Sequence, residues 1–273
     1  MGRVTFAIFF ILNVFNTQLK ANDSTLQLSL IKSIQGSFKD FEIDNLNNIY
    51  IVSSNNQIKK INQNFDSLAV FNDTRRFGNI HLLDVNNPLK ILVFYKEFST
   101  IVVLDRFLNM INTIDLRKQN LLQVSCIATS YDNKIWLFDE LENKIIKIDD
   151  LGNKLMETTD FRMLFDYGFI TEKIVDENGK LYCYNKQYGL IVFDYYGGLK
   201  HKYPIINYQY IQMHNETFTG FKKDSVSIIK LNLLKQDNFK INLKELMPIK
   251  QATQINKLFL LTNTSFNIFN ITQ

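Results

Sequence analysis

Few side chains in this sequence could carry nucleophilic or acid–base catalysis. The 273 residues include three histidines, His81, His201 and His214, and two cysteines, Cys126 and Cys183. A catalytic Ser or Cys needs a base within hydrogen-bond reach, and these histidines fall in different parts of the chain. No G-x-S-x-G motif, glycine-rich phosphate loop or metal-ligand spacing of cysteines occurs. The sequence therefore predicts a protein that is not an enzyme and that holds no cofactor.

The two cysteines are too few for a disulfide framework. Cys126 and Cys183 each lie inside an apolar run, which favours two buried thiols. A single bridge between them is the alternative that the sequence leaves open.

The elements that would position any functional group form a repeat. Six segments share a turn rich in Asn and Asp, an apolar run, a second turn and another apolar run. The second run closes on Asn62, Asp105, Asp149, Asp194, Asn232 and Asn270, at steps of 43, 44, 45, 38 and 38 residues. A regular period of this length is typical of an array built from one structural unit.

Each step between these closing residues holds four short apolar runs. In the third repeat these are residues 124–129, 135–138, 145–148 and a run near 154–157. Short runs rich in Ile, Val, Phe and Tyr between Asn and Asp turns predict β-strands joined as hairpins. Four strands in about 40–45 residues is the spacing of a propeller blade. We therefore expect an all-β fold, a six-bladed β-propeller with four-stranded blades.

The two ends of the chain complement each other in this arrangement. The sixth repeat has three strands before Gln273, whereas an additional strand at 25–31 precedes the first repeat. We expect the N-terminal strand to complete the last blade and close the ring, which removes exposed sheet edges.

The residues from Asp44 to Asn62, which read Asp-x-x-Asn-Asn-Ile-Tyr-Ile-Val and then Gln-Ile-Lys-Lys-Ile-Asn, resemble a repeat of the NHL-type or TolB-like six-bladed propellers. The likeness extends over residues 25–273. That family includes scaffolds, sugar-acid lactonases and ligand-binding modules, so the resemblance implies an architecture more than an activity. The Asn-, Ile-, Lys- and Phe-rich composition is also similar to envelope propellers of A/T-rich bacteria, some of which are accessory subunits of outer-membrane assembly or secretion machines.

The resemblance also implies an enzymatic alternative, a calcium-dependent lactonase or hydrolase that uses the central channel. Oxygen ligands for Ca²⁺ would come from innermost strands and their turns. The candidates are Glu42, Asp44, Asp84, Asn86, Asp132, Glu172 and Asp176. Four of these recur at corresponding turns of successive repeats, which favours a structural role in turns over a single metal site.

The N-terminus has the features of a secretory signal peptide. Arg3 precedes an apolar run at residues 4–12, and small and polar residues follow up to a predicted cleavage after Ala21. The run is shorter than the roughly 20 residues that a membrane-spanning helix needs. No cysteine lies near the cleavage point, so no lipid anchor is expected there. The sequence predicts a signal peptide at 1–21, a single domain at 22–273, and a secreted or periplasmic location.

The composition narrows the range of partners. The net charge is +4, and the basic residues form isolated pairs such as Lys59–Lys60 and Lys222–Lys223. Because no basic stripe follows a strand or helix, nucleic acid is not an expected partner. Without a further apolar segment of spanning length, no transmembrane segment is expected after signal removal, and we expect a monomeric propeller.

One face of the predicted propeller gathers arginine and aromatic residues, which are enriched at protein interfaces. The loops between blades share this face with the loops that join second and third strands. The predicted partner-binding residues on it are Arg75, Arg76, Phe98, Arg117, Arg162, Tyr167 and Tyr188. We therefore expect a non-catalytic scaffold that binds another envelope or outer-membrane protein. A glycan-binding module, which would use the exposed aromatic rings, is a further alternative.

Overall fold

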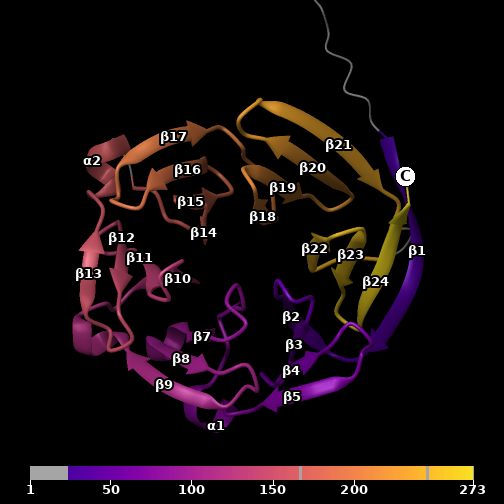
Figure 1. Cartoon of the computed structure of the whole chain (residues 1–273), viewed down its shortest axis with the longest axis horizontal. Coiled ribbons are helices and arrows are strands. Elements are labelled where there is room, and N and C mark those ends of the chain that lie inside the picture. The colour runs from indigo at the N-terminus through magenta and orange to yellow at the C-terminus, as the bar shows by residue number, and fades with distance from the viewer. Residues whose placement is uncertain (1–23, 166–167, 244–245, 273) are drawn as a thin grey trace, which may run out of the picture.

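The computed structural model describes residues 24–165, 168–243 and 246–272, and the predicted signal peptide therefore lies outside the described residues. The described chain is composed mainly of β-strands, which follow one another around a ring with a central opening (Figure 1). The prediction of an all-β ring of sheets is confirmed. None of the helices in the described ranges is both long and apolar enough to cross a membrane.

Four of the sheets contain four strands each, paired in sequence order. The first holds β2 (Phe38–Ile43), β3 (Ile49–Ser53), β4 (Ile58–Ile61) and β5 (Ser67–Phe71). The second holds β6 (Leu82–Asp84), β7 (Ile91–Tyr95), β8 (Thr100–Leu104) and β9 (Met110–Asp115). The third holds β10 (Val124–Thr129), β11 (Ile135–Asp139), β12 (Lys144–Ile148) and β13 (Lys154–Glu157). The fourth holds β14 (Lys173–Glu177), β15 (Lys180–Asn185), β16 (Gly189–Asp194) and β17 (Leu199–Tyr203).

The fifth sheet has eight strands in the order β18-β19-β20-β21-β1-β24-β23-β22. Its strands are β18 (Tyr210–His214), β19 (Thr217–Phe221), β20 (Ser225–Lys230), β21 (Lys235–Ile241), β22 (Lys250–Gln254), β23 (Lys257–Leu261), β24 (Ser265–Thr272) and β1 (Ser24–Gln35). Phe221 and Val226 of one half share a buried apolar cluster with Leu258 and Leu260 of the other. The eight strands therefore fold back on each other instead of forming one flat layer.

The N-terminal strand β1 joins the two halves of this sheet. It pairs antiparallel with β24, from Gln27 opposite Thr272 to Gln35 opposite Ser265. It also pairs parallel with β21 over three residues, from Ser24 opposite Phe239 to Leu26 opposite Ile241. The expected pairing of the N-terminal strand with the last repeat is present, and β1 extends beyond the predicted 25–31.

The hydrophobic core lies between neighbouring sheets. One buried cluster contains Tyr50 and Ile58 of the first sheet together with Val93 and Val102 of the second. Equivalent clusters connect each later pair of neighbours around the ring. The second and third strands of most sheets are buried on both faces, as expected for sheets packed on both sides, whereas the strands next to the channel carry polar and charged residues such as Lys173 and Gln212.

The turns after the third strand of the first four sheets share one hydrogen-bonding pattern. The side chain of Asp105 accepts bonds from the backbone N–H groups of Phe107 and Asn109, at 2.8 Å each. The fourth residue of each turn has a positive φ, for example 62° at Leu108 and 88° at Gly152. Asn62, Asp149 and Asp194 occupy the position of Asp105 in the other three turns. The recurrent residues that close the apolar runs therefore act as turn caps at these four sites.

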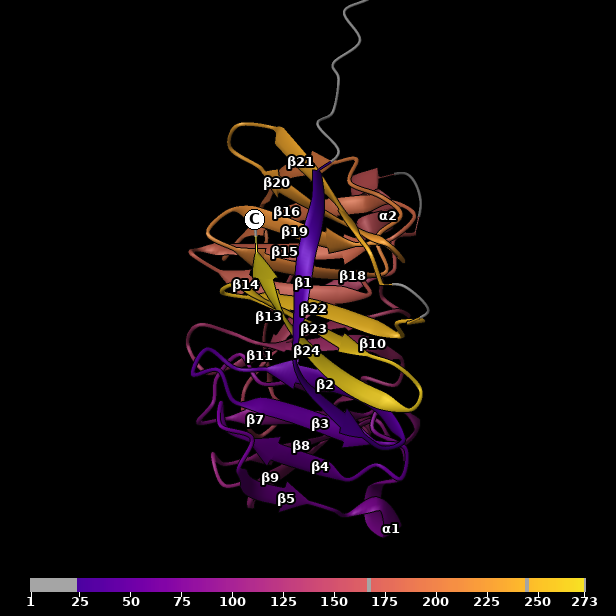
Figure 2. The ribbon, with the colours of Figure 1, turned by 90° about the vertical axis from the view of Figure 1, so that its right-hand side faces the viewer.

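The short helices of the described residues all lie in connections on one face of the ring. They are α1 (Thr74–Phe77), η1 (Lys96–Phe98), η2 (Leu116–Gln119) and α2 (Phe161–Phe165). Within each sheet the strands alternate in direction, so connections between sheets share a face with those between second and third strands. Seen edge-on, α1 and α2 lie on the right, whereas the β20–β21 turn lies on the left (Figure 2). We call the side with the four helices the helical face and the opposite side the turn face.

Candidate functional site

The helical face carries the described members of the predicted partner-binding set. Arg75 and Arg76 are exposed on α1, and the Arg76 guanidinium lies 4.9 Å from the ring centroid of Phe77. Phe77 itself is 5% exposed and belongs to the core between the first and second sheets. Because its buried ring anchors α1, the two arginines are held at the surface by a fixed support.

Phe98 lies next to this helix. It is 43% exposed, at the end of η1, and its ring edge lies 3.0 Å from the place that a Cβ on Gly78 would occupy. Gly78 follows α1 directly and has a φ of 73°, so it lacks a side chain where Phe98 needs the space. Phe98 therefore lies beside the end of α1, the helix that carries Arg75 and Arg76, although the two segments belong to different connections.

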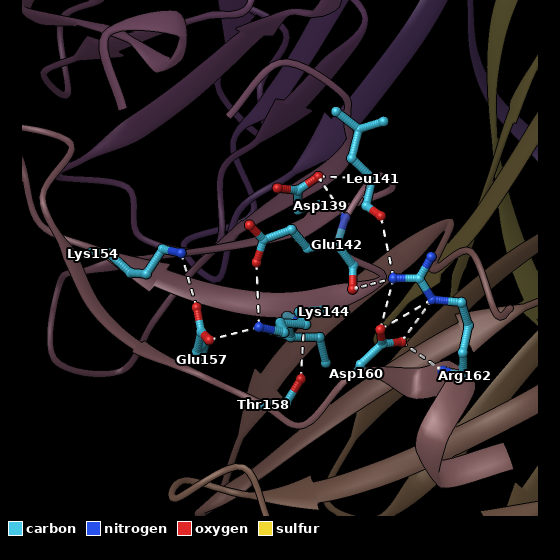
Figure 3. A network of polar contacts seen from close by, with 10 residues as sticks. Asp139, Leu141, Glu142, Lys144, Lys154, Glu157, Thr158, Asp160 and Arg162 are labelled. Carbon is cyan, nitrogen blue, oxygen red and sulfur yellow. Dashed lines mark hydrogen bonds and ion pairs between the residues drawn. The ribbon is translucent and has the colours of Figure 1, made fainter. Parts of the chain in front are cut away.

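Arg162 on α2 is the most firmly held of the predicted arginines (Figure 3). Its guanidinium donates to Asp160 Oδ2 at 2.7 Å and to the backbone oxygens of Leu141 and Glu142 at 3.4 and 3.2 Å. These contacts connect α2 to the β11–β12 loop, and the bonds from Arg162 lower the pKa of Asp160. The side chain is still 53% exposed, so part of the guanidinium remains accessible to a partner.

An ion-pair network continues from this arginine along the third sheet (Figure 3). Lys144 Nζ lies 2.7 Å from Glu157 and 3.3 Å from Glu142, and Lys154 lies 2.9 Å from Glu157. Hydrogen bonds from the two lysines lower the pKa of Glu157. Exposed ion pairs of this kind contribute little stability each, but here they order the loop that carries the acceptors of Arg162.

Arg117 and Tyr188 occupy other parts of the helical face. Arg117 on η2 is bound within its own connection, with Nε 3.0 Å from Asp115 Oδ1. Tyr188 in the β15–β16 loop is 38% exposed, and its ring centroid lies 5.7 Å from that of buried Phe169. Tyr188 therefore partly closes the edge of the core beside α2. Tyr167, the remaining member of the predicted set, lies outside the described residues.

A cavity of about 480 Å³ occupies the central channel. Lys250 at the start of β22 contacts Asp40 and Glu42 of β2 at 2.6 and 2.8 Å. Lys173 of β14 approaches Glu42 from another side of the channel, at 3.7 Å. Lys173 and Lys250 are the first residues of β14 and β22, whereas Glu42 lies near the end of β2, so the cluster joins three strands around the channel.

Burial and charge act in opposite directions on this cluster. Burial disfavours the charged forms, but Lys173 and Lys250 lower the pKa of Glu42, and Asp40 and Glu42 raise the pKa of Lys250. The charges therefore stabilise one another in the channel. Sequence reasoning considered Glu42 as a metal ligand and missed its lysine partners, because Lys250 lies 208 residues away in the chain.

The acidic candidates for a calcium site are bonded to protein donors. Asp176 accepts bonds from Trp136 Nε1 at 2.7 Å and from Ser130 Oγ at 3.0 Å. Asp84 accepts from the N–H of Asn86 at 2.9 Å, and also from the N–H of Thr129. The other acidic members are bonded as turn residues or ion pairs: Asp44 to Tyr50, Asp132 to Lys147, and Glu172 to Asn185. In the described parts of the chain no three His, Cys, Asp or Glu side chains are placed to hold one metal ion.

The three histidines occupy separate places in the ring. His81 lines the channel just before β6, and burial lowers its pKa. His201 lies on the outer strand β17, and His214 at the end of β18 contacts Glu177 at 3.1 Å. Cys126 and Cys183 are both buried free thiols in the core between the third and fourth sheets.

No family model matches the sequence, and no curated protein matches it. Solved structures with a similar fold exist. A streptogramin B lyase has a TM-score of 0.59 at 14% identity, over 85% of this chain and 78% of that one. A virginiamycin B lyase from Staphylococcus aureus has a TM-score of 0.60 at 10% identity, over 90% and 100% of the chains. The Pan2 WD40 domain of Neurospora crassa has a TM-score of 0.61 at 9% identity, over 92% and 97%.

These likenesses define the class of protein. At such low identity they show the fold alone, and the chain is a β-propeller. The neighbours include both lyases and WD40 domains, so the fold does not choose between catalysis and binding.

Proposed function

We propose that this chain is a non-catalytic, extracytoplasmic β-propeller that binds another protein through its helical face. The observation that carries the proposal is the position of the helices, which all insert on one side and present Arg75, Arg76, Phe98 and Arg162 there. Arginine and aromatic side chains on rigid supports are the usual anchors of protein interfaces. The channel charges favour the same interpretation, because they are paired with each other.

We further propose that the propeller has six blades of the NHL or TolB-like type. In this interpretation the eight-stranded sheet is two blades that β1 links. The parallel pairing of β1 with β21 covers only three residues, whereas its antiparallel pairing with β24 spans Gln27 to Gln35. The buried cluster that β21 and β23 share supports a division at this point.

The proposed partner is an envelope protein, and an outer-membrane assembly or secretion complex is the most specific form of the proposal. It depends on export through the signal peptide at residues 1–21, which leaves a single domain at 22–273. N-terminal sequencing of the protein from an extracytoplasmic fraction tests this step. A chain that begins at Asn22 or close to it is expected, and an intact Met1 in that fraction would contradict it.

The binding test is affinity purification of the tagged protein from its native envelope, with partners identified by mass spectrometry. A stoichiometric membrane-protein partner is expected. The double variant Arg75→Glu/Arg76→Glu should reduce its recovery at least tenfold, because it reverses two exposed charges on α1. Lys230→Glu/Lys235→Glu is the matched control, since it reverses two exposed lysines beside the β20–β21 turn. Equal losses in both variants, or no partner, would contradict the proposal.

A further inference from the structure

One position on the third strand differs among the first four sheets. It lies two residues before the turn cap, and its occupants in sheet order are Lys60, Val103, Lys147 and Val192. Lys60 and Lys147 are both buried. The ammonium group of Lys60 crosses to the second sheet, where it donates to the backbone oxygen of Arg106 at 2.9 Å. A lysine side chain therefore fills the space between the first and second sheets at this position.

The shorter side chain of Val103 leaves a cleft at the equivalent place between the second and third sheets. Asp150 follows the turn cap of the third sheet as Arg106 does in the second, and it lines this cleft. The volume is about 440 Å³, which is the size of a small-ligand site. Val103 is buried at the cleft, whereas Leu89 and Ile111 are exposed beside it, so part of the lining is apolar.

The polar part of the lining consists mainly of side-chain amides, from Asn87, Asn112 and Asn133. Asn87 Nδ2 donates to Asn133 Oδ1 at 2.7 Å, and Asn112 Nδ2 donates to the backbone oxygen of Asp150 at 2.5 Å. These bonds fix the amides in place. Because each amide nitrogen carries two N–H groups, Asn87 and Asn112 each retain one for a ligand.

The cations at the cleft are paired with acidic or carbonyl groups. Lys90 is only 12% exposed and contacts the Asp150 carboxylate and the backbone oxygen of Asn133. Lys147, on the neighbouring sheet, lies 2.7 Å from Asp132. Since both ammonium groups are compensated within the protein, the cleft suits a neutral ligand better than an anion.

An aromatic pair lies on the same β10–β11 turn as one of the amides. Tyr131, two residues before Asn133, is 65% exposed, and its ring centroid lies 4.3 Å from that of Tyr195 in the fourth sheet. Two residues of chain span about 7 Å at most, so a ligand that extends from the cleft reaches this ring. An exposed aromatic ring can bury the apolar C–H face of a sugar while the hydroxyl groups remain hydrated.

We propose that this cleft binds a neutral N-acetylated sugar, with the next sugar ring of the glycan against Tyr131. An acetamido group combines an N–H donor, a carbonyl acceptor and a methyl group. It therefore matches the amides of Asn87 and Asn112 and the apolar side chain of Val103 within one site. The turns that form the cleft lie on the turn face, so the helical face stays open to a protein partner.

The test is calorimetric titration of purified protein lacking residues 1–21; every strand of the ring lies within the part retained. The two probes are N,N′-diacetylchitobiose and cellobiose, which has the same linkage and carries hydroxyl groups in place of the acetamido groups. Diacetylchitobiose should bind at least tenfold more tightly, because only its acetamido groups satisfy the amides and the apolar lining. Equal affinities for the two sugars, or no binding of diacetylchitobiose, would overturn the proposal.

A variant that fills the cleft locates the binding. Val103→Met adds an unbranched, uncharged side chain and should weaken diacetylchitobiose binding at least tenfold. Val192→Met is the matched control, since Val192 holds the same position beside a smaller cleft of about 170 Å³ in the fourth sheet, and it should bind within twofold of the parent. Equal losses, or unchanged binding by Val103→Met, would overturn the assignment. Both variants leave the helical face intact, so this result is separate from the test of the proposed function.

Discussion

Trp136 of the third sheet donates a hydrogen bond from its indole Nε1 to Asp176 Oδ2 at the end of β14 in the fourth sheet, at 2.7 Å. The same carboxylate accepts from Ser130 Oγ at 3.0 Å and from the Tyr195 hydroxyl at 2.9 Å. A residue that sequence reasoning considered as a calcium ligand therefore connects two sheets. Trp136 is also the single tryptophan of the chain and is fully buried, so its fluorescence reports on this junction.

Replacement of this carboxylate should destabilise the ring. Asp176→Ala leaves the donors of Trp136 and Tyr195 without their acceptor, and we expect a loss of about 3 kcal/mol in the free energy of unfolding. Urea unfolding followed by Trp136 fluorescence measures the change. Asp150→Ala is the control, because its half-exposed carboxylate pairs with Lys90, whose ammonium group keeps a second bond to a backbone oxygen, and it should cost less than about 1 kcal/mol. Similar losses in the two variants would contradict this role of Asp176.

The backbone at Gly189 should not tolerate a side chain. Its φ is 99°, and a Cβ there would lie 2.4 Å from the backbone oxygen of Tyr203. Gly189→Ala should therefore cost ~3 kcal/mol in thermal or urea unfolding, through backbone strain and this contact. At Gly168 the nearest atom to an added Cβ is Asn143 Nδ2 at 3.8 Å, so Gly168→Ala should change stability by less than about 0.5 kcal/mol. A Gly189→Ala protein as stable as the parent would refute the geometry.

The two thiols should be unreactive in the folded protein. Burial raises the pKa of Cys126 to about 12 and raises the pKa of Cys183 well above its ordinary value. Because the thiolate is the reacting form, iodoacetamide at pH 8 should modify neither residue in the native protein and both in urea. Mass spectrometry counts the added groups. If alkylation in urea required prior reduction, the cysteines would be bridged and the prediction wrong.

The channel cluster should contribute to stability in a pH-dependent way. The lysines lower the folded-state pKa of Glu42, so its contribution is present above the ordinary glutamate pKa and is lost as the pH falls through the lowered value. Glu42→Gln should be less stable than the parent at pH 7, and the difference should shrink toward pH 3. Urea unfolding at pH 7 and at pH 3 measures this difference in the free energy of unfolding. Glu97→Gln, which changes an exposed glutamate, is the control. A difference in stability between Glu42→Gln and the parent that grows as the pH falls would contradict the role of the ion pairs.

The N-terminal strand should be required for stability through its inward side. Leu28 packs against the cluster of Phe221, Leu258 and Leu260, whereas Leu30, two residues further along the same strand, is 59% exposed. Because Leu28 is partly buried, Leu28→Asp should lower the free energy of unfolding by about 1–2 kcal/mol, less than the value of a fully buried leucine. Leu30→Asp should change it by less than about 0.5 kcal/mol. Equal effects of the two substitutions would mean that β1 contributes strand pairing but no buried apolar contacts.

Most strands could be predicted because each repeat encodes them locally. The four runs predicted in the third repeat correspond to β10, β11, β12 and β13, with ends that differ by at most one residue. The turn caps were equally predictable from the sequence, since Asp105 and Asp149 bond only to neighbours within four residues. The organisation of the strands into sheets was harder to predict, because β1 pairs with both β21 and β24 and so joins eight strands into one sheet.

The candidate site was predicted in its outline but not in its contacts. Strand alternation alone assigns Arg75, Phe98 and Arg162 to one face. Their supports come from elsewhere in the chain: Gly78 makes room for Phe98, and the carbonyl groups of Leu141 and Glu142 hold Arg162. Such contacts have no sequence signature, since they join residues of different connections.

By itself, the sequence determined the all-β class, the repeat, the strands and the turns, because their causes are short runs of β-branched and aromatic residues and Asn or Asp side chains that act within a few residues. Only the tertiary structure decided which distant groups meet. Closing the ring brings Lys250 to Glu42 across 208 residues and pairs Asp176 with Trp136 of the neighbouring sheet. These relationships depend on how sheets pack around an axis, and local residue preferences do not contain that information.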